Sequence, residues 1–588
     1  MNVKRTRFLS WFVMIVLLFT MSLPAGALAK GPQQSNDEVA YGTEGMVATA
    51  HPAASEIGAE VLRKGGTAMD AAIAIQLALN VAEPMMSGIG GGGFMMVYDA
   101  NEDDVSIIDS RERAPAGATP DMFLDENGNV IPFSERHISG DAVGVPGTLK
   151  GLMTAHEEWG TQPFNQLINP AIKLAQKGVE VNDVLADAIE DNQYELGRSA
   201  AKDVFMPNGE PLQEGELLVQ EDLANTFKEI RKSGLDAFYG GEIGQALADT
   251  VQEFGGSMTS QDLANYELSI DEPVTGTYRG YEIVSMSPPS SGGLTVLQML
   301  KMLEGFDFSE YDARSPEKYH LLAEAMHLAY ADRNAYIGDT QFVDVPMEGM
   351  LNEEYLAERA SLIEFGQANE NVEPGDPWAY QDGAPEATVN EEDDREIGET
   401  THFSVADKWG NHVSYTTTIE QVFGSGIMVP EYGFMLNNEI TDFSAVPGGP
   451  NQVEPNKRPM SSMTPTMVFE DGEPFMTLGS PGGPTIITSV LQTLVNVIDY
   501  DMELKDAIEE PRIYSASYPQ IRWEEGIPTD VRDTMEEWGH EWQSSPVEIG
   551  NVQAIKILED GTYKGAADSS RAGTAVGLDK TAGKPLKK

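Results

Sequence analysis

The sequence predicts a mixed fold of helices and strands, on three grounds. Hydrophobic residues make up 41% of the 588-residue chain and 58 residues are glycine, a composition typical of a densely packed globular protein rather than a disordered one. Helical patterns outnumber strand patterns in the first two thirds of the chain, and strand patterns dominate after Thr400. No Pro- or Ser-rich linker divides the chain into halves. We therefore expect an α/β or α+β protein with a shared core.

The individual elements follow from apolar spacing and from the positions of glycine and proline. Gly65-Gly66 interrupts an Ala-rich helical pattern, and Pro84 ends it. Helices are expected at residues 53–64, 68–82 and 317–336. Runs of β-prone residues separated by Gly or Asp turns predict strands at residues 402–407, 412–418, 465–470 and 475–479.

The glycine-rich run Gly88–Gly93 formally satisfies the dinucleotide-binding pattern. That pattern requires a strand before the glycines and a helix after them. Here a helix precedes them and the strand-like residues 94–98 follow, so we predict a tight, closely packed turn instead.

The first 29 residues have the pattern of a secretion leader. Basic residues come first, an apolar stretch follows, and Ala27-Leu28-Ala29 forms a small-residue cleavage site. The apolar stretch is too short for a stable membrane anchor, and no second run approaches about 18 apolar residues. We expect cleavage after Ala29 and a mature protein that is secreted, soluble and free of the membrane.

Acidic residues greatly outnumber basic ones. The chain has 94 Asp and Glu against 38 Lys and Arg, which gives a formal net charge of −56. Such a field repels nucleic acid and anionic membranes, so we expect neither as a partner. The size of the excess favours a halophilic protein, adapted to external salt that screens the self-repulsion. An ordinary acidic secreted protein is the alternative.

The chain contains no cysteine, which excludes disulfides, a cysteine nucleophile and thiolate metal sites. Its eight histidines show no His-Glu-x-x-His motif and no clustered spacing. We therefore expect no metal ion and no other cofactor, and a structural role for His402.

A candidate nucleophile lies at Thr400. It follows a polar, acidic stretch, residues 366–399, in which a precursor could be cut. Cleavage between Glu399 and Thr400 would give Thr400 a free α-amino group with a reference pKa of about 7.7 to 8, which can take the proton of the hydroxyl on the same residue. On these residues alone, Thr-Thr is more commonly the start of a β-strand.

Five motifs, in this order, resemble those of the γ-glutamyltransferases (γ-glutamyl transpeptidases), and the similarity runs from Gly45 almost to the C-terminus. The motifs are Asp109–Pro115, Thr400–Val405, Asn437-Asn438, Pro455–Pro465 and Gly479–Gly483. The resemblance implies an N-terminal nucleophile hydrolase of α+β class. Its four-layer αββα sandwich would be built jointly by two subunits cut from one precursor.

The resemblance also implies catalytic roles. Thr400 would be the nucleophile, Thr418 would orient it through a hydrogen bond, and the backbone N–H groups of Gly482 and Gly483 would form the oxyanion hole. Without the resemblance, Thr418 would count as an ordinary strand threonine and Gly482-Gly483 as a turn.

The γ-glutamyl head group is a zwitterion, so its pocket needs a cation for the α-carboxylate and anions for the α-ammonium. Arg111 matches the carboxylate-binding arginine of the family, and the match Arg-Glu-x-Ala-Pro selects it over Arg113. The other matching positions are Ser461 and Ser462 for the carboxylate and Glu420, Glu439 and Asp442 for the ammonium. Glu420 and Glu439 resemble the carboxylate-bearing Bacillus type.

Only eleven residues, 444–454, separate Phe443 from the Pro455 motif. Other members of the family carry a longer segment here that folds over the site as a lid. The short connection predicts a more open cleft.

These expectations combine into an exported, autoprocessed γ-glutamyltransferase and glutathione hydrolase. It would act on glutathione and other γ-glutamyl compounds, with water or amino acid and peptide amines as acceptors. A large subunit of residues 30–399 and a small subunit of residues 400–588 would form a heterodimer. The rivals are a cephalosporin acylase of the same superfamily and a non-catalytic solute-binding protein for glutamyl peptides.

Overall fold

A computed structural model of the chain describes residues 38–382 and 398–580, which belong to one compact unit. The predicted leader and residues 383–397 of the acidic segment lie outside the described residues. Within the two described ranges, no helix combines the length and the apolar character needed to span a bilayer.

The first large sheet is antiparallel throughout and carries the predicted nucleophile at its centre. In spatial order its strands are β19 (Thr574–Leu578), β2 (Gly45–Thr49), β10 (Thr400–Asp407), β11 (His412–Thr418), β3 (Gly92–Asp99), β4 (Asp104–Asp109) and β7 (Ser269–Asp271). Strand β10 pairs with β2 on one side and β11 on the other. Segments from both sides of the predicted cut therefore build one sheet.

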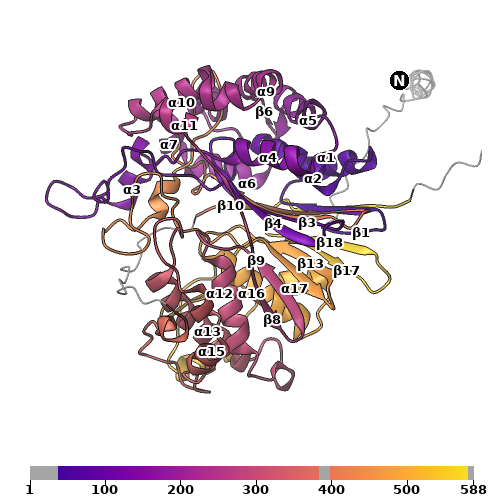
Figure 1. The fold of residues 1–588 in the computed structure, drawn as a ribbon, viewed down its shortest axis with the longest axis vertical. Helices are drawn as coiled ribbons and strands as arrows, with labels where there is room; N and C mark the ends of the chain where they lie inside the picture. The colour runs from indigo at the N-terminus through magenta and orange to yellow at the C-terminus, as the bar shows by residue number, and fades with distance from the viewer. Residues whose placement is uncertain (1–37, 383–397, 581–588) are drawn as a thin grey trace, which may run out of the picture. The chain divides into compact units, whose positions relative to one another are not determined.

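The second large sheet is also antiparallel and faces the first (Figure 1). Its order is β1 (Val39–Gly42), β18 (Tyr563–Ala567), β17 (Gln553–Ile557), β13 (Glu473–Gly479), β12 (Thr466–Glu470), β9 (Tyr281–Ser285) and β8 (Val274–Tyr278). Two smaller sheets pair β14 (Ile513–Tyr514), β15 (Gln520–Trp523) and β16 (Glu541–Trp542), and β5 (Val179–Glu180) with β6 (Leu217–Leu218).

One layer of helices covers the outer face of the first sheet (Figure 1). It contains α1 (Pro52–Arg63), α2 (Ala68–Ala82), α4 (Thr148–Trp159), α5 (Phe164–Lys177), α9 (Glu221–Ser233) and α10 (Glu242–Glu253). The shorter helices α3 (Phe133–Arg136), α6 (Asp183–Asp191), α7 (Gln193–Gly197), α8 (Ala201–Phe205) and α11 (Ser260–Ala264) extend this part of the chain.

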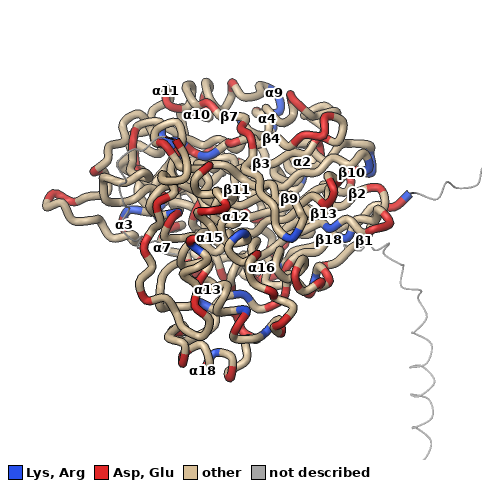
Figure 2. The backbone as a smooth tube through the Cα atoms, turned by 60° about the horizontal axis from the view of Figure 1, so that its bottom comes forward, with Lys and Arg blue, Asp and Glu red and all other residues tan. Residues whose placement is uncertain are grey.

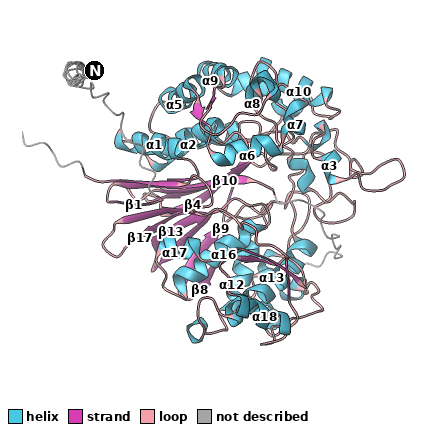
Figure 3. Cartoon of the chain, turned by 180° about the vertical axis from the view of Figure 1, so that it is seen from behind, coloured by secondary structure: helices cyan, strands magenta, loops and turns pink. Residues whose placement is uncertain are grey.

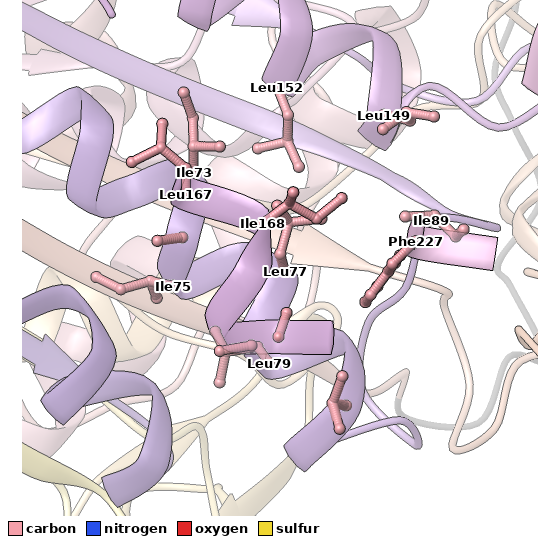
Figure 4. Packing of buried hydrophobic residues seen from close by; sticks show 14 of the residues in the cluster. Ile73, Ile75, Leu77, Leu79, Ile89, Leu149, Leu152, Leu167, Ile168 and Phe227 are labelled. Carbon is pink, nitrogen blue, oxygen red and sulfur yellow. The ribbon is translucent and has the colours of Figure 1, made fainter. Parts of the chain in front are cut away.

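Helix α2 explains why this layer needs so much alanine. Every one of its residues is buried, because the sheet packs against one side and helices α4 and α5 against the other. Its isoleucines and leucines interdigitate with Leu149, Leu152, Leu167 and Ile168 (Figure 4). Thr67 and Asp70 close a capping box at its N-terminus. Small side chains between the larger ones let neighbouring helices approach closely on all sides.

A second layer of helices covers the second sheet (Figure 3). Its members are α12 (Gly292–Leu303), α13 (Pro316–Tyr336), α14 (Met347–Met350), α15 (Glu353–Ala360), α16 (Thr485–Ile498), α17 (Leu504–Glu509) and α18 (Thr529–Glu537). The predicted α+β class is therefore confirmed as a structure with two large antiparallel sheets and helices on their outer faces.

The predicted elements agree closely with the observed ones. The three predicted helices match α1, α2 and α13, and the four predicted strands match β10–β13. Strand β10 begins two residues earlier than predicted, so Thr400 is its first residue. The glycine-rich run is a close-packed turn: a Cβ at Gly90 would lie 2.0 Å from the carbonyl oxygen of Met435, and one at Gly91 2.1 Å from that of Thr418.

Candidate active site

A cavity of about 430 Å³ brings together residues from widely separated stretches of the chain, from Arg111 to Gln543. Its wall includes the predicted residues Arg111, Thr400, Thr418, Glu420, Glu439, Asp442, Ser461, Ser462 and Gly483. Gly482 precedes Gly483 in the chain and is not part of the wall. Residues widely separated in sequence thus meet in one place, as a site for a small zwitterion requires.

The hydroxyl groups of Thr400 and Thr418 are neighbours because the two residues pair across strands β10 and β11. The Thr400 hydroxyl donates to the Thr418 hydroxyl over 3.4 Å. The Thr418 hydroxyl donates to the carbonyl oxygen of Glu399 over 2.9 Å and accepts from the backbone N–H of Glu420 over 2.8 Å. In the uncut chain Thr418 therefore links the candidate nucleophile to the carbonyl of the predicted cleavage site.

Arg571 holds both sides of the Glu399–Thr400 bond. One of its nitrogens donates to the carbonyl oxygen of Thr400 over 3.0 Å, and another pairs with the carboxylate of Glu399. Burial opposes the charge on Arg571, but Glu399 and Glu83 outweigh it and raise its pKa. Glu83 in turn accepts a hydrogen bond from the hydroxyl of Thr401 over 2.9 Å. Sequence reasoning missed Arg571, which lies in none of the five motifs.

Gly482 and Gly483 precede helix α16 with φ angles of +126° and +55°, where glycine is strongly favoured. A Cβ at Gly483 would lie 2.7 Å from the backbone nitrogen of Gly398. In the part of the chain that the structure describes, no acceptor takes a hydrogen bond from either backbone N–H. These two donors close to the cleavage segment have the character that an oxyanion site needs.

Arg111 is 1% exposed and sits in a cage of acceptors. Its guanidinium donates to the carbonyl oxygens of Pro459 over 3.2 Å and Met460 over 3.1 Å, and it pairs with the carboxylates of Glu439 and Asp442. Burial disfavours the charged form, but the two carboxylates outweigh it and raise the pKa of Arg111. The cation stays ionised and fixed in direction.

The acidic side chains at the cavity, Glu420 and Glu439, and the neighbouring Glu112 are buried. Glu439 lies in a 3-10 helix, η6 (Glu439–Asp442), and burial raises the pKa of its carboxyl group. Burial also raises the pKa of Glu112 well above its usual value, and Glu439 adds to this effect.

Glu420 has φ +81°, a strained conformation for a non-glycine residue, and its carbonyl accepts from the backbone N–H of Glu399 over 2.7 Å. Glu420 thus belongs both to the cavity wall and to the cleavage segment.

The two serines are placed by different neighbours. Ser461 accepts a hydrogen bond from the backbone N–H of Met463 over 3.0 Å, and Ser462 accepts one from Arg333 over 3.0 Å. Arg333 is anchored by Ser291 at 2.8 Å, and the motifs did not indicate it. Arg113 lies outside the cavity wall, where it donates to the carbonyl oxygen of Glu267 over 3.0 Å.

The short connection before Pro455 lies at the rim of the cavity. Ser444 and Asn451 contribute to the wall, while Val446 is 41% exposed. Asn451 donates to the carbonyl oxygen of Asp442 over 2.7 Å and accepts from the backbone N–H of Met460 over 2.9 Å. These hydrogen bonds hold the short connection against Asp442 and Met460.

His402 is buried between the sheets. Its ring nitrogens contact the hydroxyls of Thr416 at 2.9 Å and Ser404 at 3.2 Å, and burial lowers its pKa to about 3. A neutral, enclosed imidazole of this kind supports the packing of the sheets.

Comparison with known proteins places the whole chain among close relatives. Residues 54–578 match the family described as gamma-glutamyltranspeptidase. The chain is 62% identical to the glutathione hydrolase proenzyme of Bacillus subtilis (strain 168), over 96% of this chain and 97% of the relative. It is 40% identical to the acylase ACY 1 proenzyme of Pseudomonas sp. (strain SE83), over 92% of this chain and 94% of that protein.

Solved structures agree. The crystal structure of cephalosporin acylase from Bacillus halodurans matches with a TM-score of 0.82 and 28% identity, covering 94% of this chain and 99% of the other. A Helicobacter pylori gamma-glutamyltranspeptidase chain matches with a TM-score of 0.55 and 39% identity, covering 57% of this chain and 97% of the other.

Proposed function

The chain belongs to the γ-glutamyltranspeptidase family, and on that premise we propose that it is an autoprocessed γ-glutamyltransferase and glutathione hydrolase. The observation that carries the proposal is the meeting of a strand-initial threonine with a zwitterion clamp in one cavity. Thr400 and Thr418 supply hydroxyls, while Arg111 lies beside the carboxylates of Glu439 and Asp442. The γ-glutamyl head group matches this arrangement, because it carries a carboxylate for the cation and an ammonium group for the anions.

We propose that the precursor cuts itself at Glu399–Thr400. The Thr400 hydroxyl would attack the carbonyl carbon of Glu399, the proton would pass to the Thr400 nitrogen as the peptide bond breaks, and water would hydrolyse the resulting ester. Thr418 would polarise the carbonyl that it already contacts, and Arg571 would hold the segment in place. The subunits, residues 30–399 and 400–588, would stay together because β10 remains paired with β2.

Turnover would use the same Thr400 hydroxyl as nucleophile, with the free α-amino group created by the cut as its base. The new α-amino group of Thr400 would take the hydroxyl proton as the oxygen attacks the γ-carbonyl of the donor. The N–H groups of Gly482 and Gly483 would stabilise the oxyanion, and the protonated amine would return the proton to the leaving nitrogen. Water or an acceptor amine would then cleave the γ-glutamyl ester and restore Thr400.

The clamp would set the register of the donor. Arg111, Ser461 and Ser462 would bind the α-carboxylate, and the ammonium would lie among Glu420, Glu439 and Asp442. The ammonium group would give the carboxyl group of Glu439 a second positive partner beside Arg111, so binding would lower the pKa that burial has raised.

An acylase for side chains without an ammonium group is the second candidate, favoured by the structural match to cephalosporin acylase. The two functions differ by one group: a γ-glutamyl amide carries the α-ammonium and a glutaryl amide lacks it. We expect rapid release of p-nitroaniline from γ-glutamyl-p-nitroanilide and little from glutaryl-p-nitroanilide. Preference for the glutaryl compound would reverse the assignment.

The remaining proposals concern processing and habitat. We propose removal of the leader after Ala29, secretion and tolerance of salt, on the pattern of the leader and the net charge of −56. A mass spectrum of the purified protein, showing one chain that begins at Lys30 and another at Thr400, would test both cuts together. A single uncut, inactive chain would favour the solute-binding alternative.

A further inference from the structure

The cavity extends beyond the zwitterion clamp to a second wall built around the small sheet β14–β15–β16. The residues of this wall are Tyr514, Ala516, Ser517, Gln520, Arg522 and Gln543. Arg522 is the only charged residue among them. The chain has 94 acidic and 38 basic residues, so an average stretch of its surface carries more carboxylates than cations. This part of the cavity wall has one cation and no carboxylate, which is the opposite balance.

Strand geometry directs Arg522 toward the cavity. Ile521 and Trp523 are buried on one face of β15, and alternation puts Gln520 and Arg522 on the other. Arg522 pairs in register with Tyr514, and its guanidinium carbon lies 5.5 Å from the centre of the Tyr514 ring. The tyrosine therefore supports the planar cation from one side.

Arg522 differs from the other arginines of the cavity. Arg111 and Arg333 are each anchored by several hydrogen bonds. Among residues 38–382 and 398–580, Arg522 forms no ion pair and no side-chain hydrogen bond, and its side chain is half-buried. Its bidentate donor face remains available to a carboxylate.

A continuous line of contacts joins this wall to the oxyanion glycines. Pro484 follows Gly483, and its carbonyl accepts from the Tyr330 hydroxyl over 2.6 Å. The rings of Tyr330 and Tyr514 meet edge to face, with centroids 5.7 Å apart. Arg522 therefore lies on the Gly483 side of the reaction centre, whereas Arg111 belongs to the clamp that holds the head group.

We propose that Arg522, supported by Tyr514, binds the carboxylate of the amine half of the reaction: the peptide that leaves the donor, or the amino acid or peptide that accepts the γ-glutamyl group. This inference rests on the proposed function. With the head group held by Arg111 and the reacting carbonyl near Gly483, the amine half extends toward β14 and β15. A peptide in that position ends in a carboxylate that the guanidinium can bind with two parallel hydrogen bonds.

The test compares donors with and without that carboxylate. Arg522→Gln should lower kcat/KM for glutathione hydrolysis by about tenfold or more, the range expected for a lost charged hydrogen bond. Turnover of γ-glutamyl-p-nitroanilide, whose amine half has no carboxylate, should change less than about twofold. Arg522→Lys should recover part of the loss. Arg231→Gln, which removes the same charge from the exposed face of α9, is the matched control and should leave both substrates unaffected.

A second arm identifies the source of the carboxylate. With γ-glutamyl-p-nitroanilide as donor, transfer to glycylglycine is compared with transfer to glycylglycinamide. Selective loss with glycylglycine assigns Arg522 to the acceptor, and loss confined to glutathione hydrolysis assigns it to the leaving peptide.

Other results overturn the proposal. Equal losses on carboxylate and carboxylate-free compounds would make Arg522 a structural residue, and no loss on any compound would eliminate the subsite. If the unmodified enzyme failed to cleave γ-glutamyl-p-nitroanilide, the proposed function itself would fall. The two failures are therefore distinguishable.

Discussion

The charges of the cavity and the charges of the surface are organised in opposite ways. Inside, the buried Arg111 contacts Glu439 and Asp442, and the partly buried Arg571 contacts Glu399. Outside, Asp and Glu are spread over many loops and helix ends with far fewer Lys and Arg (Figure 2). Paired, buried charges are screened little by salt, whereas an excess of exposed carboxylates repels itself and is screened strongly. Activity and stability should therefore respond to different perturbations.

The largest effect is expected at Thr400, whose hydroxyl is the proposed nucleophile of both cleavage and turnover. Thr400→Ala should remain one uncut chain without activity, because cleavage and turnover use the same hydroxyl. Thr400→Ser should be cut slowly and keep some activity, since it retains both the hydroxyl and the future amine. Gel electrophoresis and mass spectrometry measure the cut. Cleavage at Glu399–Thr400 in the alanine variant would contradict the autocatalytic scheme.

The second largest effect is expected at Arg111, and it tests whether donor recognition requires the planar guanidinium group. Arg111→Lys should be processed normally but lose about 1.5 to 3 kcal/mol of donor recognition, because one ammonium cannot contact two carboxylates and two carbonyls in the same geometry. We expect the loss in kcat/KM for γ-glutamyl-p-nitroanilide. Arg113→Lys, outside the cavity wall, is the control. A damaging Arg113→Lys beside a harmless Arg111→Lys would move the clamp by two residues.

Acid should destabilise the fold at its buried histidines, whereas it relieves repulsion among the surface carboxylates, so pH separates these two contributions. Burial lowers the pKa of His402 to about 3 and that of His412 to about 4, from an ordinary 6.5. The unfolded chain therefore binds protons that the folded chain does not, and stability is complete above pH 6.5 and falls as the pH drops toward 3. At pH 5 each such histidine should cost about 2 kcal/mol.

Denaturant unfolding at pH 7 and pH 5 measures this loss. His402→Gln should reduce its pH dependence. If the free energy of unfolding rose on acidification, the relief of surface repulsion and the protonation of buried carboxyl groups such as Glu439 would exceed the cost at the histidines, and the comparison would have to be reversed.

The rim, where the two regions meet, should show a smaller effect. The short connection at residues 444–454 leaves no long segment to close over the acyl-enzyme, so water should compete with acceptor amines. We expect appreciable hydrolysis beside transfer, and release of glutamate from γ-linked glutamyl oligomers within about tenfold of the rate with glutathione. Chromatography of the released glutamate measures it. Negligible release, with glutathione cleaved under the same conditions, would count against an open cleft.

The smallest effect is a gradual one at the surface. Raising sodium chloride from about 0.01 M to about 1 M shortens the Debye length from about 30 Å to about 3 Å, which screens the repulsion among carboxylates. The melting temperature should rise, and activity should persist, because the buried clamp is screened less. Calorimetry across this range is the measurement. A flat or falling melting temperature would identify the acidity as ordinary surface charge and remove the case for a saline habitat.

Much of the fold could be predicted from local sequence. The apolar spacing located α1, α2 and α13, because each helix buries a continuous set of neighbouring positions. The start of β10 was placed two residues late, because polar Thr400 and Thr401 interrupt the apolar alternation although both are buried in the structure. The order of strands in the two sheets depends on pairings between distant segments, which no local pattern records.

The same division holds within the site. Arg111, Thr400 and Gly483 lie in short motifs that resemble those of the family, and the resemblance indicated their roles. His320, His327 and His540, which show no clustered spacing in the sequence, come together in space. Nδ1 of His320 lies 2.8 Å from Nε2 of His540, and the ring centroids of His327 and His540 are 6.2 Å apart. Burial, together with charge repulsion from the nearby His320 and His327, lowers the pKa of His540 to about 3. Spacing along the chain therefore gave no sign of this cluster.

By itself the sequence determined three helices and four strands, the candidate nucleophile with its predicted cleavage bond, and the excess of acidic residues, because each depends on contiguous residues or on composition. Only the tertiary structure decided that Arg571 holds the bond at Thr400 and that Arg522 shares a cavity with Arg111. These contacts join segments more than a hundred residues apart. The Arg571 contact exists because β10 lies inside a sheet whose neighbours come from both ends of the chain, and a guanidinium enclosed there favours a carboxylate partner.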